Sequence, residues 1–483
     1  SPGYNGWIRG YKFCRTYEPD YCGWHTASQQ GICPNNSVGY SIKDANNVDR
    51  YGYIACSVTS NPDGEKDLAK PSECGDRTPN PVYIGLGRKE LTAPIYRTNN
   101  NIFPIDFQLL YQHNDNKRSG ATWRHTYYKF IVLDGQQTPT SARVYRGKGA
   151  LLFYKDQTIG EWRSDYDIND SLTELINSDN QRIGWTYTDK FSDRIENYDA
   201  YGRLISIEDR SGLIHTFTYN SKDSLVSITD TFGNKLQFTH DDYGNFSTLV
   251  DPAGGNYQFT YASNGNLTAV TYPDAKTRTY HYNEPAYTSN ANLPNALTGI
   301  TDENGVRYAT YTYDTQGRAV VTEHAGGADR YVLGYSADGS NTLVTDPLNS
   351  QYTHTFQTIL GVAKSTGQSQ PAGSGCSAAA SSITYDVNGN AASRADFKGN
   401  KTCYAYDLTR NLEIARVEGL SSGSACPGDL SGYTPAANSS ERQPKWSLLL
   451  VSLVRQAFGV EAIMCHEMAW GRNTAEVMFI GPA

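Results

Sequence analysis

One pentapeptide near the C-terminus carries residue types that could support metal-dependent hydrolysis. His466-Glu467-Met468-Ala469-Trp470 begins like the helix of a zinc protease, in which two histidines four residues apart bind the metal and the glutamate acts as general base. Trp470 occupies the position of the second histidine. Because an indole does not ligate zinc, the motif predicts no metalloprotease.

Two further motifs start like ligand-binding loops and then depart from them. Asp386-Val387-Asn388-Gly389-Asn390 begins like a calcium loop, yet Ala391 takes the glycine position and Phe397 the position of the bidentate glutamate. Gly85-Leu86-Gly87 lacks the third glycine and the strand-to-helix setting of a dinucleotide site. The sequence therefore predicts no metal-binding and no cofactor-binding residue.

His125 is the remaining candidate for acid–base chemistry. Trp123, His125 and Tyr127 alternate along an expected strand, so their side chains share one face. A catalytic base needs a nucleophile or a paired carboxylate beside it, and the sequence places neither next to His125. We interpret it as a structural histidine, wedged between aromatic rings and hydrogen-bonded to backbone. The sequence predicts no catalytic residue and no enzyme.

A sequence repeat predicts the secondary-structure elements that position these side chains. One position, which is mostly tyrosine, recurs every 21 residues, and we call such a recurring position a slot. A second slot, rich in glycine, and a third, occupied by aspartate, recur with the same period. A fixed period of this length indicates a repeat architecture. The slots are occupied by Tyr198, Tyr219, His240, Tyr261 and Tyr282, by Gly202, Asp223, Gly244 and Gly265, and by Asp209, Asp230 and Asp251.

Each unit contains the signals for two strands and two turns. Phe217-Thr218-Tyr219 alternates large apolar and small polar residues, which is typical of a half-buried strand. In Asp199-Ala200-Tyr201-Gly202 the carboxylate can accept from an N–H group two residues on, and glycine tolerates positive φ. Asp209-Arg210-Ser211-Gly212 supplies the second turn. Because one hairpin cannot bury its own face, we expect the units to stack into a continuous antiparallel sheet over at least residues 198–420.

The repeats also resemble a known family. Tyr198-Asp199-x-x-Gly202-Arg203-Leu204, Tyr313-Asp314-Thr315-Gln316-Gly317-Arg318 and Tyr385-Asp386-Val387-Asn388-Gly389-Asn390 are similar to the YD repeats of RHS-family proteins. That family includes bacterial polymorphic toxins, the shell-forming subunits of insecticidal toxin complexes and animal teneurins. The resemblance implies an all-β fold of stacked antiparallel β-hairpins that form a curved strip or partial hollow shell. Several members enclose a C-terminal toxin until delivery.

Composition and resemblance together predict four regions. Cys74-Gly75 and the stretch around Trp123-Arg124-His125 are similar to the segment that introduces the repeats in bacterial RHS proteins. The regions are a cysteine-containing N-terminal region (1–75), a β-rich region preceding the repeats (76–190), the YD-repeat array (191–440) and an out-of-pattern tail (441–483).

The tail departs from the pattern of the array. All three methionines of the chain fall in its last twenty residues, and Trp446 to Ile463 can form an amphipathic helix. The tail is either a short effector or docking helix, or a sequence that no longer follows the family pattern because of a truncation or a frameshift. We favour the second interpretation, because neither the period nor the turn chemistry continues. The sequence thus predicts the N-terminal part of an RHS shell from a truncated gene.

Cysteine usage favours an oxidising compartment. Without Cys465 of the tail the chain has eight cysteines, an even number that suits disulfides in a secreted or cell-surface protein. The closest pair lies eight residues apart, which does not fit the paired spacing of zinc sites. We expect at least one disulfide among the first five, which are Cys14, Cys22, Cys33, Cys56 and Cys74; Cys376, Cys403 and Cys426 follow.

Charge and hydropathy exclude some partners and leave others. The net charge of −8 argues against a nucleic-acid surface, and no apolar run approaches the roughly 18 residues of a membrane span. The leading hypothesis is a structural, encapsulating shell segment whose partner is an enclosed toxin domain or a secretion and delivery component. The alternative is a carbohydrate-binding or adhesive protein that stacks cell-surface glycans on its tyrosines and tryptophans. Aromatics that point into the core favour the shell, and rows that face solvent favour the glycan binder.

Overall fold

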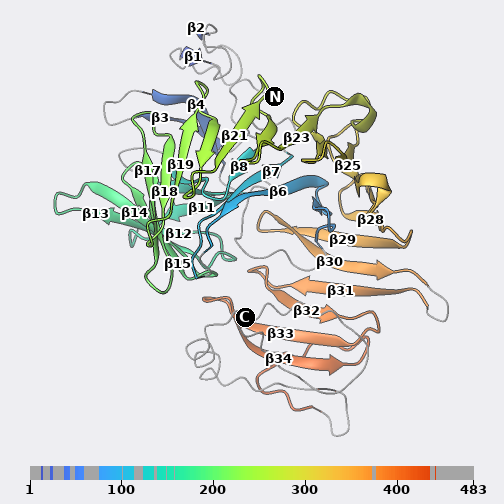
Figure 1. The fold of residues 1–483 in the computed structure, drawn as a ribbon. Helices are drawn as coiled ribbons and strands as arrows, with labels where there is room; N and C mark the ends of the chain where they lie inside the picture. Colours follow the sequence, from blue (N-terminus) through green and yellow to red (C-terminus); the bar gives the residue numbers. More distant parts are fainter. Residues whose placement is uncertain are drawn as a thin grey trace. The chain divides into compact units, whose positions relative to one another are not determined.

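The computed structural model of the chain is almost entirely antiparallel β-structure (Figure 1). It describes residues 76–99, 102–113, 123–134, 139–147, 149–156, 158–372, 377–435 and 441, and the backbone of 12–14, 22–24, 37–43 and 49–58. The chain divides into two units, Ser1–Gln443 and Pro444–Ala483, and all described residues belong to the first. The helix predicted for the tail lies outside the described residues.

One long sheet contains 26 strands, β9 to β34, and each pairs antiparallel with the next strand of the chain. We call this sheet the strip; it confirms the predicted stack of hairpins. Its strands are β9 (Lys129–Leu133), β10 (Ser141–Arg146), β11 (Gly149–Lys155), β12 (Trp162–Arg163), β13 (Ser171–Ile176), β14 (Arg182–Asp189), β15 (Arg194–Asp199), β16 (Leu204–Glu208), β17 (Ile214–Tyr219), β18 (Leu225–Thr229), β19 (Lys235–His240), β20 (Phe246–Val250), β21 (Asn256–Tyr261), β22 (Leu267–Thr271), β23 (Thr277–Tyr282), β24 (Leu297–Thr301), β25 (Arg307–Tyr313), β26 (Ala319–His324), β27 (Tyr331–Tyr335), β28 (Asn341–Thr345), β29 (Gln351–Ile359), β30 (Val362–Gln370), β31 (Ala379–Tyr385), β32 (Ala391–Ala395), β33 (Lys401–Asp407) and β34 (Leu412–Leu420).

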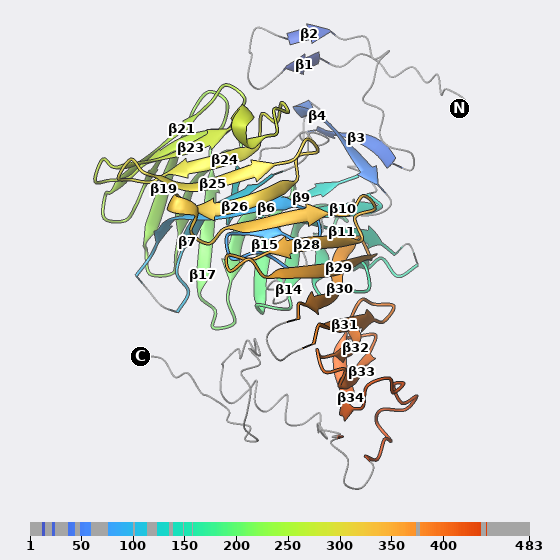
Figure 2. The same cartoon turned by 90° about the vertical axis from the view of Figure 1, so that its right-hand side faces the viewer.

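The strip is open and curls back at its start. Among the described strands, β9 and β34 share no ladder, and Figure 2 shows β31 to β34 continuing the sheet beyond β30. At the other end, β9 pairs with β10 on one side, while Phe130 makes an isolated bridge to Arg203 beside β16. The N–H of Ile131 also donates to the carbonyl of Gly202 at 2.8 Å. These contacts curve the first eight strands toward a ring.

The strip begins earlier than the repeat pattern suggested. Residues 129–189, which the sequence placed in the region before the array, form β9 to β14 of the same sheet. These strands lack the tyrosine slot, but they alternate in the same way, with Trp185 and Tyr187 fully buried on one face. Strand pairing therefore continues across the predicted boundary at residue 190.

The turns use the aspartate chemistry expected from the sequence. Asp199 Oδ1 accepts from the N–H of Tyr201 at 2.9 Å, and Gly202 has a φ of 84°. The bond to the residue two positions on was predicted, and it is confirmed. The same oxygen also accepts from the N–H of Arg203 at 2.9 Å, four residues on, which locks the whole turn. Asp209, Asp230, Asp251, Asp302, Asp314, Asp346, Asp386 and Asp396 repeat this pair of bonds.

A β-bulge sits directly before the tyrosine slot of each regular unit. The register shifts between Thr218 and Tyr219, so that Tyr219 pairs with Leu225 while Thr218 pairs with Ser227. An extra residue in one strand changes which side chains face the core. Leu225 and Ile228 are therefore both buried although they are three residues apart. The same shift occurs before Tyr198, His240, Tyr261, Tyr282, Tyr313 and Tyr385.

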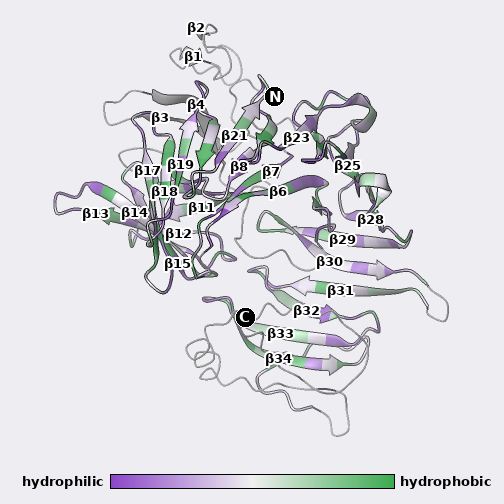
Figure 3. Ribbon diagram, viewed as in Figure 1, coloured by the Kyte–Doolittle hydropathy of each residue, from purple (hydrophilic) through white to green (hydrophobic). Residues whose placement is uncertain are grey.

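A second, smaller sheet packs against one face of the strip. This inner sheet consists of β5 (Val82–Tyr83), β6 (Arg88–Arg97), β7 (Asp106–Gln112) and β8 (Trp123–His125). In both ribbon views β6 and β7, in blue, lie between the green and the orange strands of the strip. Apolar and polar residues both occur along these strands (Figure 3), and the largest buried cluster combines apolar residues of the inner sheet, such as Phe107 and Tyr111, with apolar residues of the strip. We call the face of the strip that packs on the inner sheet its inner face.

Two further hairpins precede the inner sheet. β1 (Lys12–Cys14) pairs with β2 (Cys22–Trp24), and β3 (Ser37–Lys43) pairs with β4 (Asp49–Val58). The backbone register sets Cys14 opposite Cys22. The side chains of the first five cysteines lie outside the described residues, so the disulfide predicted among them stays a prediction.

A disulfide joins Cys403 on β33 to Cys426 in the segment that follows β34, 23 residues later. Its cysteine at position 403 is buried in a small cluster with Ala415, Val417 and Leu430. Replacing both cysteines by alanine should lower the free energy of unfolding by about 3 kcal/mol, because the cross-link restricts the unfolded chain. Urea denaturation measures the loss. If the thiols of Cys403 and Cys426 both react fully with an alkylating reagent in urea without reductant, the prediction is contradicted.

Candidate functional site on the inner face of the strip

The inner sheet crosses many strands of the strip in order. Along β7 and the segments flanking it, aromatic residues four positions apart meet successive strands. Phe103 stacks on His215 of β17 at 3.9 Å between ring centroids, and Phe107 lies 5.0 Å from Phe238 of β19. Tyr111 reaches β24, where its hydroxyl accepts from the N–H of Leu297 at 2.8 Å. The inner sheet is therefore bound by strands that are far apart in the sequence.

The residues from Asn80 to Gly87 bind the later strands. The hydroxyl of Thr342 on β28 donates to the carbonyl of Ile84 at 2.9 Å, and the N–H of Ala319 on β26 donates to the carbonyl of Gly87 at 2.7 Å. Gly87 has a φ of 65°, and a β-carbon there would lie 2.6 Å from Cβ of Arg318. Only glycine permits this close approach of the two backbones.

The tyrosine slot forms a line of hydrogen bonds on the inner face. The hydroxyl of Tyr282 donates to the carbonyl of Leu267 at 2.6 Å, and Leu267 pairs with Tyr261, the slot residue of the preceding unit. Tyr313 donates in the same way to Leu297, the partner of Tyr282. Tyr282 and Tyr313 thus each join their own unit to the one before it. Tyr219, Tyr261 and Tyr282 are partly buried and pack on the main core.

Buried charges gather where the strip curls back. Glu196 on β15 accepts from Nζ of Lys129 at 2.5 Å and from the hydroxyl of Tyr198 at 2.6 Å, and lies 3.3 Å from the guanidinium of Arg146. Arg146 also pairs with Asp189 at 3.0 Å and covers the ring of Tyr187. β9, β10, β14 and β15 contribute these side chains, so the cluster ties the first strand to strands five and six positions along. No pattern in the sequence predicts this cluster, because its members are scattered over 70 residues.

The neighbours of Glu196 decide its ionisation. Burial on its own raises the pKa of this carboxyl, but Arg146 and Lys129 more than offset burial and lower the pKa to about 2. Burial lowers the pKa of Lys129, and Arg146 adds to that effect. Glu196 is therefore an anion that its neighbours fully engage. A carboxylate held in this way is not available as a general base.

His125 lies between aromatic rings, as predicted. Its ring is 5.5 Å from that of Phe107 and 5.1 Å from that of Phe246. The predicted backbone hydrogen bond is wrong for Nδ1, which is buried and makes no hydrogen bond. Burial, and then the nearby His240, lower the pKa of His125 to about 3. The imidazole is neutral near neutral pH and serves as part of the aromatic core.

The depressed pKa of His125 predicts acid lability. The folded pKa of about 3 lies below the ordinary value of 6.5, so the stabilising contribution is complete above pH 6.5 and is lost as the pH falls toward 3. Between pH 7 and pH 5 the loss should be about 2 kcal/mol. Urea denaturation at both pH values measures it, and His125→Phe should show a smaller pH dependence by that amount. An identical pH dependence in both proteins would contradict the assignment. Burial also lowers the pKa of His215, His240, His281 and His354, with the same sign.

The described side chains offer no metal centre of the usual kind. Within the described ranges, no group of three or more histidine, cysteine, aspartate or glutamate side chains could hold an ion. The same part of the chain contains no helix long and apolar enough to cross a membrane. Of the sequence motifs, Gly85-Leu86-Gly87 serves the backbone contact described above, and Asp386 forms a turn with the N–H groups of Asn388 and Asn390. His466-Glu467 lies outside the described residues.

Comparison with known proteins identifies the repeat. Residues 145–290 match the family model described as teneurin YD-shell, and the slots from Tyr198 to Tyr282 fall inside the matched segment. Residues 145–290 are therefore similar to the YD-shell of teneurins, which agrees with the predicted resemblance to the RHS/YD-repeat family. No curated protein matches the chain.

Solved structures similar to the chain include toxin components. The Photorhabdus luminescens Tc holotoxin pore (TccC3-D651A) is 11% identical, with coverage of 68% of this chain and 18% of that chain and a TM-score of 0.28. A TcdB2-TccC3 structure is 12% identical, with coverage of 76% and 22% and a TM-score of 0.24. A porin-like protein from Bacteroides uniformis is 11% identical, with coverage of 60% and 91% and a TM-score of 0.14. The chain thus spans about a fifth of the length of the toxin chains.

Proposed function

We propose that this chain is a non-catalytic wall segment of a secreted or cell-surface RHS-type shell that encloses a toxin domain or another delivered polypeptide. The observation that supports the proposal best is the direction of the tyrosine slots. Their side chains lie on the inner face, and those of Tyr282 and Tyr313 link neighbouring units, as a self-supporting wall requires. The alternative, an adhesive surface with solvent-facing aromatic rows, predicts the opposite orientation for the same residues.

Protease protection in the producing cells tests this proposal. An affinity tag placed in the exposed turn at Asp338–Gly339, between β27 and β28, allows the protein to be isolated from the extracellular or surface fraction. We expect a second polypeptide to co-purify, to resist protease while the shell is folded, and to be degraded once urea unfolds the shell. The absence of any protected polypeptide would refute enclosure. A co-purifying polypeptide that protease degrades at the same rate with and without urea would also refute enclosure.

A further inference from the structure

Lys89 on β6 is a fully buried lysine whose amine is held by neutral groups. Its Nζ donates to Oδ1 of Asn80 at 3.1 Å and to the carbonyl of Pro81 at 3.2 Å, and lies 4.0 Å from the centroid of the Tyr311 ring. Burial lowers the pKa of Lys89 to about 7, with only a partial offset from Glu90. A large share of these side chains therefore carries a neutral amine near neutral pH, and a desolvated amine of this kind is a nucleophile.

The side-chain amide of Asn80 lies directly against this amine. Asn80 is buried as well, and its backbone carbonyl accepts from the hydroxyl of Thr78 at 2.8 Å and from that of Thr322 on β26 at 3.3 Å. Its side-chain amide also faces the hydroxyl of Tyr311. Cγ lies one bond of about 1.2 Å beyond Oδ1, so a small rotation of either side chain brings Nζ to the roughly 3–3.5 Å from which bond formation starts.

We propose that Lys89 and Asn80 form an intramolecular isopeptide bond, an amide between the two side chains, in the folded protein. The lone pair of Nζ attacks Cγ, the bond from Cγ to Nδ2 breaks, and Nδ2 leaves as ammonia. Nζ loses one proton and Nδ2 gains one, so the step consumes no water, oxidant or reductant. Burial raises the pKa of Tyr311. Its hydroxyl therefore keeps a proton that it can donate to the leaving nitrogen, and the proton from Nζ replaces it.

The sequence around Asn80 closes a competing reaction. Asparagine ordinarily loses ammonia when the backbone N–H of the next residue attacks its Cγ. Pro81 follows Asn80 and has no N–H, so a loss of ammonia at Asn80 points to another nucleophile. The cross-link joins the residue before β5 to β6, across the segment that binds β26 and β28. It is independent of the proposed shell function.

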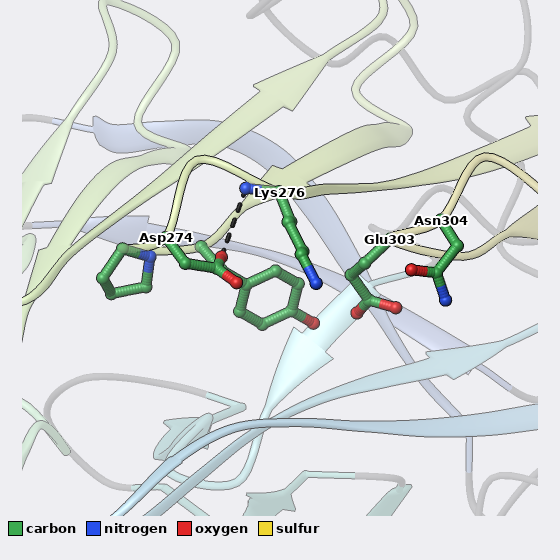
Figure 4. A pocket seen from close by; sticks show the side chains of 6 residues that line it. Asp274, Lys276, Glu303 and Asn304 are labelled. Atoms are coloured by element: carbon green, nitrogen blue, oxygen red, sulfur yellow. Dashed lines mark hydrogen bonds between the residues drawn. The ribbon is translucent and has the colours of Figure 1, made fainter.

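An exposed lysine and asparagine provide the contrast. Lys276 and Asn304 line one pocket at two turns of the strip, and both are exposed (Figure 4). An exposed lysine is ordinarily protonated near neutral pH and lacks the free lone pair that the attack requires. We therefore expect no bond between these two residues, and Lys276 is the matched control position for Lys89.

Peptide mapping of the whole folded chain tests the proposal. Trypsin cleaves after Arg77, Arg88 and Arg97, and also after an unmodified Lys89, so an unlinked protein yields residues 78–88 and 90–97 as separate peptides. The linked protein should yield one branched peptide of residues 78–88 and 89–97, lighter than their sum by one ammonia. Lys89→Met should abolish the loss of ammonia at Asn80. Lys276→Met should yield the same branched peptide as the unmodified protein.

A second variant tests the part played by Tyr311. Tyr311→Phe keeps the ring over Nζ and removes the proton donor, so the bond should form about a hundredfold more slowly. Cell-free synthesis, sampled over time and mapped in the same way, measures this rate. An unchanged rate would overturn the role of Tyr311. Separate peptides from the unmodified folded protein would overturn the bond itself, whether or not either variant folds, and so would a loss of ammonia at Asn80 that persists in folded Lys89→Met.

Discussion

Replacing Tyr111 by alanine should lower the free energy of unfolding by about 3–5 kcal/mol, the range for deletion of a large buried aromatic side chain. Tyr111 is fully buried in β7 of the inner sheet, and its ring lies 5.4 Å from that of Trp123. Its hydroxyl donates to the carbonyl of Asn295 at 2.7 Å and accepts from the N–H of Leu297 at 2.8 Å. The substitution removes packing on one sheet and hydrogen bonds to the other. Chemical denaturation measures the loss.

Two variants separate packing from hydrogen bonding at this position. Tyr111→Phe keeps the ring but leaves the buried N–H of Leu297 without its acceptor, so a loss of about 1–3 kcal/mol is expected. Tyr243→Ala, at an exposed turn of the strip, should change stability by less than about 0.5 kcal/mol. If Tyr111→Phe were as harmless as the turn variant, the hydroxyl would not connect the two sheets.

Replacing Glu196 by glutamine should also destabilise the protein by about 3–5 kcal/mol, because it leaves Lys129 and Arg146 buried without their shared anion. Thermal or urea denaturation near neutral pH measures this effect. The folded pKa of Glu196, about 2, lies below the ordinary value of 4.5, so its contribution is present above pH 4.5 and is lost as the pH falls toward 2. The variant and the unmodified protein should therefore become more alike in acid.

The control for Glu196 is a carboxylate on the same strip. Glu208 pairs with Ile195 in the ladder between β15 and β16 and is partly exposed. Glu208→Gln should change stability by less than about 0.5 kcal/mol. Equal losses at both positions would mean that the charge cluster at the start of the strip has no special role.

The regular part of the fold was predictable because its signals are local. An aspartate and a glycine three residues later determine each turn, as at Asp199 and Gly202, and two such turns in every 21 residues leave room for two strands. The bulges explain a spacing of apolar residues that the 21-residue period alone does not explain. Leu225 and Ile228 are spaced by three, which does not fit the two-residue period of a straight strand, and the bulge allows both side chains to be buried.

The docking of the inner sheet was not predictable from one sequence. The hydroxyl of Tyr83 donates to the carbonyl of Ala363, 280 residues away, and no periodic pattern connects two such positions. The charge cluster was not predictable for the same reason. Lys129 and Glu196 lie on separate strands, and only the curvature of the strip brings their side chains together. His125 was placed correctly among aromatics, but its unpaired Nδ1 depends on Phe107 and Phe246, which come from two different sheets.

The inner sheet is bound to the tyrosine slots of the strip. A double-mutant cycle between Trp123 and Tyr282 tests this binding most directly. Nε1 of Trp123 on β8 donates to the hydroxyl of Tyr282 on β23 at 2.6 Å, across 159 residues of sequence, and that hydroxyl donates on to the carbonyl of Leu267. Trp123→Phe, Tyr282→Phe and the double variant each keep an aromatic ring in place.

The free energies of unfolding of the four proteins give the coupling between the two side chains. We predict a coupling of about 1 kcal/mol or more, because the double variant breaks the shared hydrogen bond once and not twice. Losses that add within about 0.3–0.5 kcal/mol would show that the two side chains do not interact, and would contradict the placement of the inner sheet on the strip.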